Sequence, residues 1–118
     1  MKAKEDNIIL NLSVVFSLAI INYCEKLKIQ KQFEIASQLL RSGTSIGANI
    51  WEAQSSESRK DFVHKLKIAD KEAKEVEYWL LLCKSSEHIE NYEVTLDKNL
   101  LSIQKLLSRI ISTNKKRL

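Results

Sequence analysis

Residues 43–47, GTSIG, match the G-x-S-x-G pattern in which serine hydrolases hold their nucleophile, here Ser45. Such a serine needs a strand before it and a helix after it, because the strained turn between them exposes the hydroxyl group. The residues before the pattern, FEIASQLLRS, have helical periodicity instead. The α/β sheet that carries such a turn also needs far more than 118 residues. We therefore expect Ser45 to have no nucleophilic role.

Two other kinds of chemistry have equally little support. A phosphate-binding loop needs a lysine directly after its last glycine, and the residue after Gly47 is an alanine. A di-iron bundle needs two Glu-x-x-His motifs. Asp61 precedes His64 by three residues, but Ser85 occupies the equivalent place before His88. We predict a protein without catalytic residues, metal or cofactor.

The positive charge of the chain is concentrated at its C-terminal end. The net charge is +4, but residues 94–118 hold six basic side chains and one acidic, whereas residues 57–93 hold seven and nine. A basic surface binds phosphate backbones without reading base sequence, and the binding weakens with salt. The alternative is a solvated face with favourable cations near a helix C-terminus. The candidate nucleic-acid-binding residues are Lys98, Lys105, Arg109, Lys115, Lys116 and Arg117.

Helices must position these residues, because the composition is unsuited to a sheet. The chain has no proline, two glycines and 44% hydrophobic residues, and sheets need many turns that consume Gly, Pro, Asn and Asp. Apolar residues recur at steps of three and four in segments at about 6–27, 32–54, 58–84 and 95–115. Helices of this length with short connections predict one all-α domain over 1–118, an up-down-up-down, left-handed four-helix bundle.

The first helix is apolar on two opposite faces. A helix that is apolar nearly all round must be covered on more than one side, and one small bundle covers a single stripe. We therefore predict that copies of the chain associate through the second face, which consists of Leu10, Val14, Leu18 and Ile21. The apolar stretch is about 14 residues long, whereas a membrane-spanning helix needs about 20. We expect a cytoplasmic protein with reduced cysteines and no membrane partner.

The two glycines of the second helix predict close packing. Gly43 and Gly47 lie four residues apart on one helix face, and each costs roughly 1 kcal/mol relative to alanine inside a helix. Such a pair indicates that a neighbouring backbone or a large ring approaches closely. Tyr78 and Trp79 of the third helix are the candidates for that ring.

The second helix also carries a polar stripe, formed by Arg41, Ser45, Asn49 and Glu52. We expect it to pair with charges of the third helix such as Lys71, Glu72 or Glu75, because asparagine is otherwise a poor residue inside a helix. A solvated stripe is the alternative. The residues that we assign to helix packing are Arg41, Ser42, Gly43, Ser45, Gly47, Asn49, Glu52, Phe62, Ala69, Glu72, Ala73, Tyr78 and Trp79.

Residues 38–53, QLLRSGTSIGANIWEA, resemble the signature of a bacterial family of four-helix-bundle proteins, the 23S rRNA intervening-sequence proteins. Residues 58–82 are similar to the family's third helix, with S-x-x-D-F, K-x-x-I-A, K-E-A and Y-W-L elements in order. LLSIQKLLSRIISTNKK resembles its last helix. The resemblance implies a ring-like homopentamer with no assigned enzymatic activity. A related accessory protein of diversity-generating retroelements binds nucleic acid and a reverse transcriptase.

Residues and resemblance together lead to two hypotheses of function. The first is a non-enzymatic oligomeric four-helix-bundle protein that binds RNA or DNA through a basic surface, or scaffolds a nucleic-acid-processing partner such as a reverse transcriptase. The alternative is a purely structural or protein-binding assembly with no nucleic-acid role. Both predict a homo-oligomer, which the family resemblance makes a pentamer.

Overall fold

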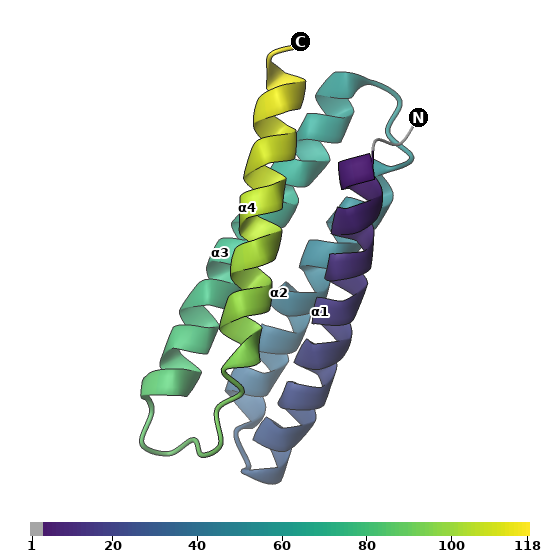
Figure 1. The fold of residues 1–118 in the computed structure, drawn as a ribbon. Helices are drawn as coiled ribbons and strands as arrows, with labels where there is room; N and C mark the ends of the chain where they lie inside the picture. The colour runs from purple at the N-terminus through teal and green to yellow at the C-terminus, as the bar shows by residue number, and fades with distance from the viewer. Residues whose placement is uncertain (1–3) are drawn as a thin grey trace.

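The computed structural model describes the backbone of residues 4–118 and the side chains of residues 8–118, which form four helices (Figure 1). The helices are α1 (Lys4–Ile29), α2 (Phe33–Ala53), α3 (Arg59–Ser85) and α4 (Thr95–Lys115). Each end lies within two residues of the end expected from the sequence. The described part of the chain contains no strand, so the all-α, four-helix prediction is confirmed.

The four helices lie side by side in an elongated molecule of 47 × 20 × 19 Å (Figure 1). Helix α1 packs against α2 and α4, and α3 packs against the same two helices. Helices α1 and α3 are therefore diagonal to one another. The α1–α2 and α3–α4 connections lie at one end of the molecule, and the C-terminus lies at the other end together with the α2–α3 connection (Figure 1).

The helix ends follow from local chemistry. The hydroxyl of Ser58 accepts a hydrogen bond from the backbone N–H of Asp61 at 3.0 Å, which caps the start of α3. The α1–α2 connection turns at Lys31, whose φ of 65° is left-handed. The α3–α4 connection turns at Asn91, with a φ of 58°. Asparagine tolerates this conformation better than most residues, whereas lysine adopts it with steric strain at its β-carbon.

One hydrophobic core runs through the molecule, and every helix contributes to it. From α1 come Ile9, Phe16, Ile20, Tyr23 and Leu27, all at most 1% exposed. The expected apolar face of α4 is buried over its whole length. Burial of such side chains stabilises the fold by roughly 1.5–3 kcal/mol each before chain entropy is subtracted. The four helices therefore share a single core.

Candidate functional site

The GTSIG segment lies entirely inside α2, with no strand or sharp turn beside it. Ser45 is half-buried, and its hydroxyl donates a hydrogen bond to the carbonyl of Arg41 at 2.7 Å. Asn49 in turn donates from its side-chain amide to the carbonyl of Ser45 at 2.8 Å. The hydroxyl of Ser45 is thus tied to its own helix, and the geometry that would expose a nucleophile is not present in α2.

The glycines of α2 contact α1 and not the aromatic rings of α3. A β-carbon added at Gly43 would lie 2.8 Å from Cγ2 of Ile20. One added at Gly47 would lie 3.1 Å from Oγ of Ser17, and 3.5 Å from the backbone oxygen of Ser13. The prediction of close packing is confirmed, but Tyr78 and Trp79 were the wrong partners. Periodicity shows which face of a helix is bare, but it does not show which neighbour meets that face.

The ring of Tyr78 lies on the surface of α3 and that of Trp79 is half-buried against the edge of the core, with 5.2 Å between the two ring centroids. The indole N–H of Trp79 donates to Oε2 of Glu75 at 2.9 Å. Tyr78 is 54% exposed and points away from the core. The two aromatic residues therefore border the polar contact between α2 and α3.

Arg41 and Glu52 of the polar stripe pair with α3, as the sequence predicts, whereas Ser45 and Asn49 form hydrogen bonds within α2. The guanidinium of Arg41 contacts the carboxylate of Glu72 at 3.4 Å and also forms an ion pair with Glu75. Farther along, Lys65 contacts Glu52 at 3.2 Å. The hydrogen bond from Trp79 and the contact with Arg41 hold the pKa of Glu75 below its ordinary value. These contacts fix the register of two helices and leave no cationic group of α2 facing solvent alone.

The remaining packing residues lie on α2 and α3 and are buried or half-buried. Ser42 is fully buried, and its hydroxyl donates to the carbonyl of Gln38 at 2.9 Å. Ala69 and Ala73 are buried on α3. Phe62, which the sequence places on the same face, is half-buried and packs against the edge of the core.

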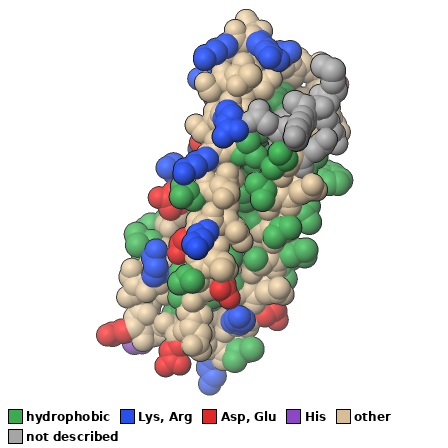
Figure 2. All heavy atoms as spheres, in the orientation of Figure 1, with side chains coloured by type: hydrophobic (Ala, Val, Ile, Leu, Met, Phe, Trp, Pro, Cys, Tyr) green, Lys and Arg blue, Asp and Glu red, His purple; other side chains and the backbone are tan. Residues whose placement is uncertain are grey.

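All six candidate nucleic-acid-binding side chains are exposed. Lys98, Lys105, Arg109 and Lys116 follow the outer face of α4, and basic side chains gather along this helix and at its C-terminal end (Figure 2). Lys115 lies nearer to α3 and lines a pocket between the two helices. Arg117 follows α4 in the terminal turn. These residues share one side of the molecule.

The structure adds a second basic row that the sequence analysis missed. Helix α3 exposes Lys60, Lys67, Lys71 and Lys74 on its outer face, next to α4. Of its acidic residues, Glu72 and Glu75 reach Arg41, whereas Glu77 accepts a hydrogen bond from Gln104 at 3.0 Å and lies 3.8 Å from Lys74 of this row. Lys71 is therefore not the partner of the α2 stripe that the sequence allowed.

The signal for this row is the spacing of its lysines. They follow one another at steps of seven, four and three residues, which is one helix face. The net charge of residues 57–93 does not reveal this row, because the acidic residues on the sides of the helix cancel the lysines on its outer face. We call the two rows together the basic face; it consists of Lys60, Lys67, Lys71, Lys74, Lys98, Lys105, Arg109, Lys115, Lys116 and Arg117.

The outer surface of α1 is uncharged between residues 7 and 24 and largely apolar. Of the predicted interface, Val14, Leu18 and Ile21 are 46%, 56% and 41% exposed. Leu10 is the exception, because it is only 8% exposed and belongs to the chain's own core. Its placement on the interface was wrong, since its position on α1 lies close to the side that packs on α2.

Two further residues, Ile8 and Val15, are exposed on the same surface. We call the exposed set the α1 apolar face; it consists of Ile8, Val14, Val15, Leu18 and Ile21. Hydrophobic side chains on this side of the molecule are visible in Figure 2. Exposed apolar side chains gathered on one helix face are typical of interaction surfaces.

Helix α1 is also long and apolar enough to cross a membrane. Its Ile8–Ile29 segment is 22 residues long and contains an 18-residue window with a mean hydropathy of 1.8, so it is longer than the stretch of about 14 residues expected from the sequence. Core helices pass the same test, and α1 supplies Phe16, Ile20 and Leu27 to the core. The length and composition of α1 therefore fit a core helix as well as a membrane-spanning helix.

Among the described residues, no group of three or more His, Cys, Asp or Glu side chains could hold a metal ion. Cys24 and Cys83 are buried and unbonded to each other, and the thiol of Cys24 donates to the carbonyl of Ala36 at 3.4 Å. Burial raises the pKa of Cys24 to about 11 and also raises that of Cys83. Both thiols stay protonated and unreactive inside the core.

Fold and sequence together define the class of this protein. Residues 5–109 match the family model described as 23S rRNA-intervening sequence protein. The chain belongs to the 23S rRNA-intervening sequence protein family. It is similar to the crystal structure of a protein of unknown function from the S23 ribosomal protein family of Bacteroides thetaiotaomicron VPI-5482. The two chains are 45% identical, the match covers 92% of this chain and 98% of that one, and the TM-score is 0.86. No curated protein matches the chain.

Proposed function

We propose that this protein is a non-enzymatic, oligomeric four-helix bundle that binds RNA or DNA through the basic face of α3 and α4. One observation carries the proposal: lysines and arginines occupy the outer faces of both helices, while Glu72 and Glu75 of α3 are turned toward Arg41 of α2. A surface of one charge sign attracts phosphate backbones at long range. The proposal assigns no catalytic residue, metal or cofactor to the chain.

The arrangement of the two surfaces supports assembly with nucleic acid on the outside. Helices α1 and α3 are diagonal neighbours in the bundle, so the α1 apolar face and the α3 lysines point in different directions. Copies that associate through α1 leave the basic face open. We infer an up-down-up-down, left-handed bundle that forms a homo-oligomeric ring, a pentamer by family resemblance, and acts in the cytoplasm away from membranes.

Assembly strengthens the electrostatic argument. A single chain carries a net charge of +4, and each added copy brings another basic face to the same particle. Bound lysines and arginines release counterions from the phosphate backbone, so the affinity falls steeply as salt rises. Contacts with phosphates position the nucleic-acid backbone and do not read the base sequence. We therefore expect binding with little preference for base sequence.

Titration of a fluorescent RNA at low and at high salt tests the proposal. The native protein should bind at low salt and lose at least roughly tenfold in affinity at high salt. Two charge-reversal variants should each weaken binding at low salt. One changes Lys60, Lys67, Lys71 and Lys74 to Glu, and the other changes Lys115, Lys116 and Arg117 to Glu.

A matched control reverses three exposed lysines near the other end of the molecule, Lys26, Lys28 and Lys31. It makes the same change in net charge as the Lys115, Lys116 and Arg117 variant, so it isolates the position of the charge. Circular dichroism should show the same helix content for all variants. No binding at low salt, or equal losses in the control and in the basic-face variants, would eliminate the basic face as the binding surface.

A purely structural or protein-binding assembly is the second candidate. The α1 apolar face favours it, because that surface is built for contact with protein and needs no nucleic acid. In this alternative the protein scaffolds a partner, such as a reverse transcriptase by family analogy. An oligomer that binds no RNA or DNA at low salt would favour this candidate over the first.

A further inference from the structure

A pocket of about 490 Å³ lies between the C-terminal half of α4 and the first half of α3. Its lining combines three lysines with two hydroxyl groups, one carboxylate and one apolar side chain: Lys67, Asp70, Ser108, Ile111, Ser112, Lys115 and Lys116. Pockets of this size accept small-molecule groups such as a nucleotide. The pocket opens on the basic face.

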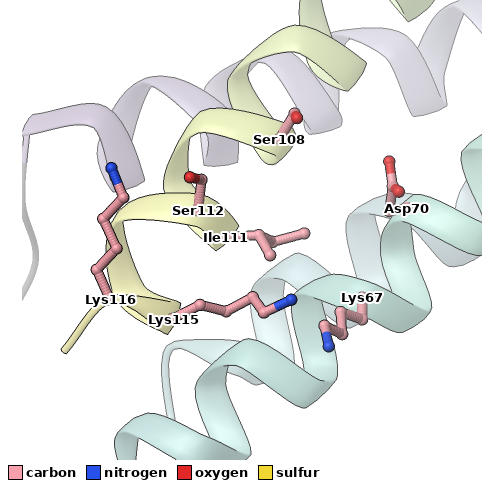
Figure 3. Close-up of a pocket in the computed structure, with 7 residues that line it drawn as sticks. All are labelled: Lys67, Asp70, Ser108, Ile111, Ser112, Lys115 and Lys116. Carbon is pink, nitrogen blue, oxygen red and sulfur yellow. The ribbon is translucent and has the colours of Figure 1, made fainter. Parts of the chain in front are cut away.

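The polar groups are divided between the two ends of the pocket (Figure 3). Lys67 and Lys115 reach toward one another from α3 and α4 at one end, with Ile111 beside them. Asp70 and Ser108 lie toward the other end, and Lys116 points away along the last turn of α4. The pocket therefore offers two cations at one end, an acceptor and a hydroxyl at the other, and an apolar surface between them.

The two lysines converge without a counterion. Some other lysines of this chain have acidic partners: Lys65 contacts Glu52 at 3.2 Å, and Lys84 contacts Asp97 at 3.6 Å. In the part of the chain with described side chains, neither Lys67 nor Lys115 has such a partner. Two ammonium groups directed into one space repel each other, and an anion between them removes the repulsion. A phosphate group supplies that anion.

Asp70 further limits which ligands fit the pocket. A carboxylate is unfavourable beside a bare phosphate, but it accepts a strong hydrogen bond from a hydroxyl group. A ribonucleotide carries a phosphate and, one sugar away, a 2′-hydroxyl that DNA lacks. Ser108 adds a second hydroxyl partner at that end, and Ile111 offers an apolar surface to the sugar or base. The phosphate and the 2′-hydroxyl of such a unit then both have complementary partners.

We propose that this pocket binds one ribonucleotide unit of a single-stranded RNA. Lys67 and Lys115 hold its phosphate, and Asp70 accepts the hydrogen bond of its 2′-hydroxyl. The inference rests on the proposed function and deepens it, because it makes RNA and not DNA the preferred ligand of the basic face. The remaining lysines of the basic face attract the phosphates of RNA and of DNA equally.

The test compares a short fluorescent oligouridine with the matching oligodeoxyuridine, which differ only in the 2′-hydroxyl. The native protein should bind the RNA more tightly, by about tenfold for one charge-assisted hydrogen bond. Asp70→Ala removes the acceptor and should bring the ratio of the two affinities close to one. Glu77→Ala makes the same charge change on the same helix outside the pocket, and it should leave the ratio as it is.

The phosphate end is tested with two double variants. Lys67→Ala with Lys115→Ala empties the pocket of its converging cations, and it should cost the RNA about tenfold more affinity than the control. The control is Lys60→Ala with Lys105→Ala, which removes one exposed lysine from each helix outside the pocket. Equal affinity of the native protein for RNA and DNA, or equal losses in both double variants, overturns the proposal.

Other outcomes separate the pocket from the proposed function. If both oligonucleotides bind equally and every lysine matters to a similar extent, the basic face stands and the pocket assignment fails. If neither binds at low salt, the proposed function and the pocket fail together. Competition with uridine monophosphate tests whether the pocket binds a free nucleotide instead of RNA. A free nucleotide that binds through Lys67 and Lys115, with no effect of these lysines on oligouridine, would assign the pocket to small nucleotides and overturn its role in RNA binding.

Discussion

Gly43 of α2 lies directly against Ile20 of α1, so closely that a β-carbon at position 43 would come within 2.8 Å of the γ-methyl group of Ile20. Ile20 is fully buried, and its branched side chain has few alternative rotamers. One turn later, Gly47 faces the flexible hydroxyl of Ser17 at 3.1 Å. The two glycines thus serve the same helix contact but differ in what a methyl group would displace.

Alanine at these two positions should have opposite effects on stability. Gly43→Ala gains about 1 kcal/mol of helix propensity but overpacks a tight contact at a cost of about 1–3 kcal/mol, for a net loss of up to about 2 kcal/mol. Gly47→Ala gains the same propensity, and the hydroxyl of Ser17 can rotate away, so its stability should rise or stay unchanged. Urea unfolding of both variants measures the difference. A Gly43→Ala protein that is more stable than Gly47→Ala would refute the close contact with Ile20.

Loss of Arg41 should cost little stability near neutral pH, although the residue joins two carboxylates. Its side chain is half exposed, and exposed ion pairs contribute less than about 1 kcal/mol. A double-mutant cycle with Arg41→Met and Glu75→Gln measures the coupling. A coupling several times larger would show that the α2–α3 contact depends on this pair more than its exposure allows.

The same pair gives a pH dependence of known sign. The folded-state pKa of Glu75 lies below its ordinary value of 4.5, so its contribution is present at neutral pH and is lost as pH falls below 4.5 through the folded pKa. The stability difference between the native protein and Glu75→Gln should therefore shrink on acidification. Unfolding curves from pH 7 down to pH 3 test this, and a difference that grows toward pH 3 contradicts it.

The two cysteines should be inert in the folded protein. Burial raises the pKa of Cys24 to about 11 from an ordinary value of 9.0, so the unfolded chain loses this proton first as pH rises. The contribution to the free energy of unfolding is full below pH 9 and declines between pH 9 and 11. A thiol reagent at pH 8 should label both cysteines only after denaturant unfolds the chain. Rapid labelling of the native protein would show that the core opens at this site.

Much of the fold could be predicted because helix periodicity is a local signal. The buried face of α4 and the Ser58 cap both follow from residues three or four positions apart. The partner of the glycines could not be predicted in this way, since contacts between helices depend on rotation about each axis. The interface prediction for Leu10 was wrong for the same reason. A rotation of α1 by a few tens of degrees about its axis moves this side chain from the outer surface to the core.

The site was predicted in part. The α4 cations stood out because few acids interrupt them, whereas the α3 lysines were hidden among acids that point to other helices. Reading charge by helix face would have found Lys67 and Lys71. The pocket between α3 and α4 could not have been found, because it joins Lys67 and Lys115, which are far apart in the sequence and meet only in the folded chain.

Association through α1 underlies the proposed placement of the basic face, and solution mass tests it most directly. Multi-angle light scattering should give a multiple of 13.6 kDa for the native protein. Leu18→Lys places a charge at the centre of the α1 apolar face, where a desolvated interface cannot accommodate it, and should shift the mass toward one chain with unchanged helix content. Ser102→Lys, on the exposed surface of α4 and outside the pocket, is the matched control and should keep the assembled mass. A native mass of 13.6 kDa would contradict the account.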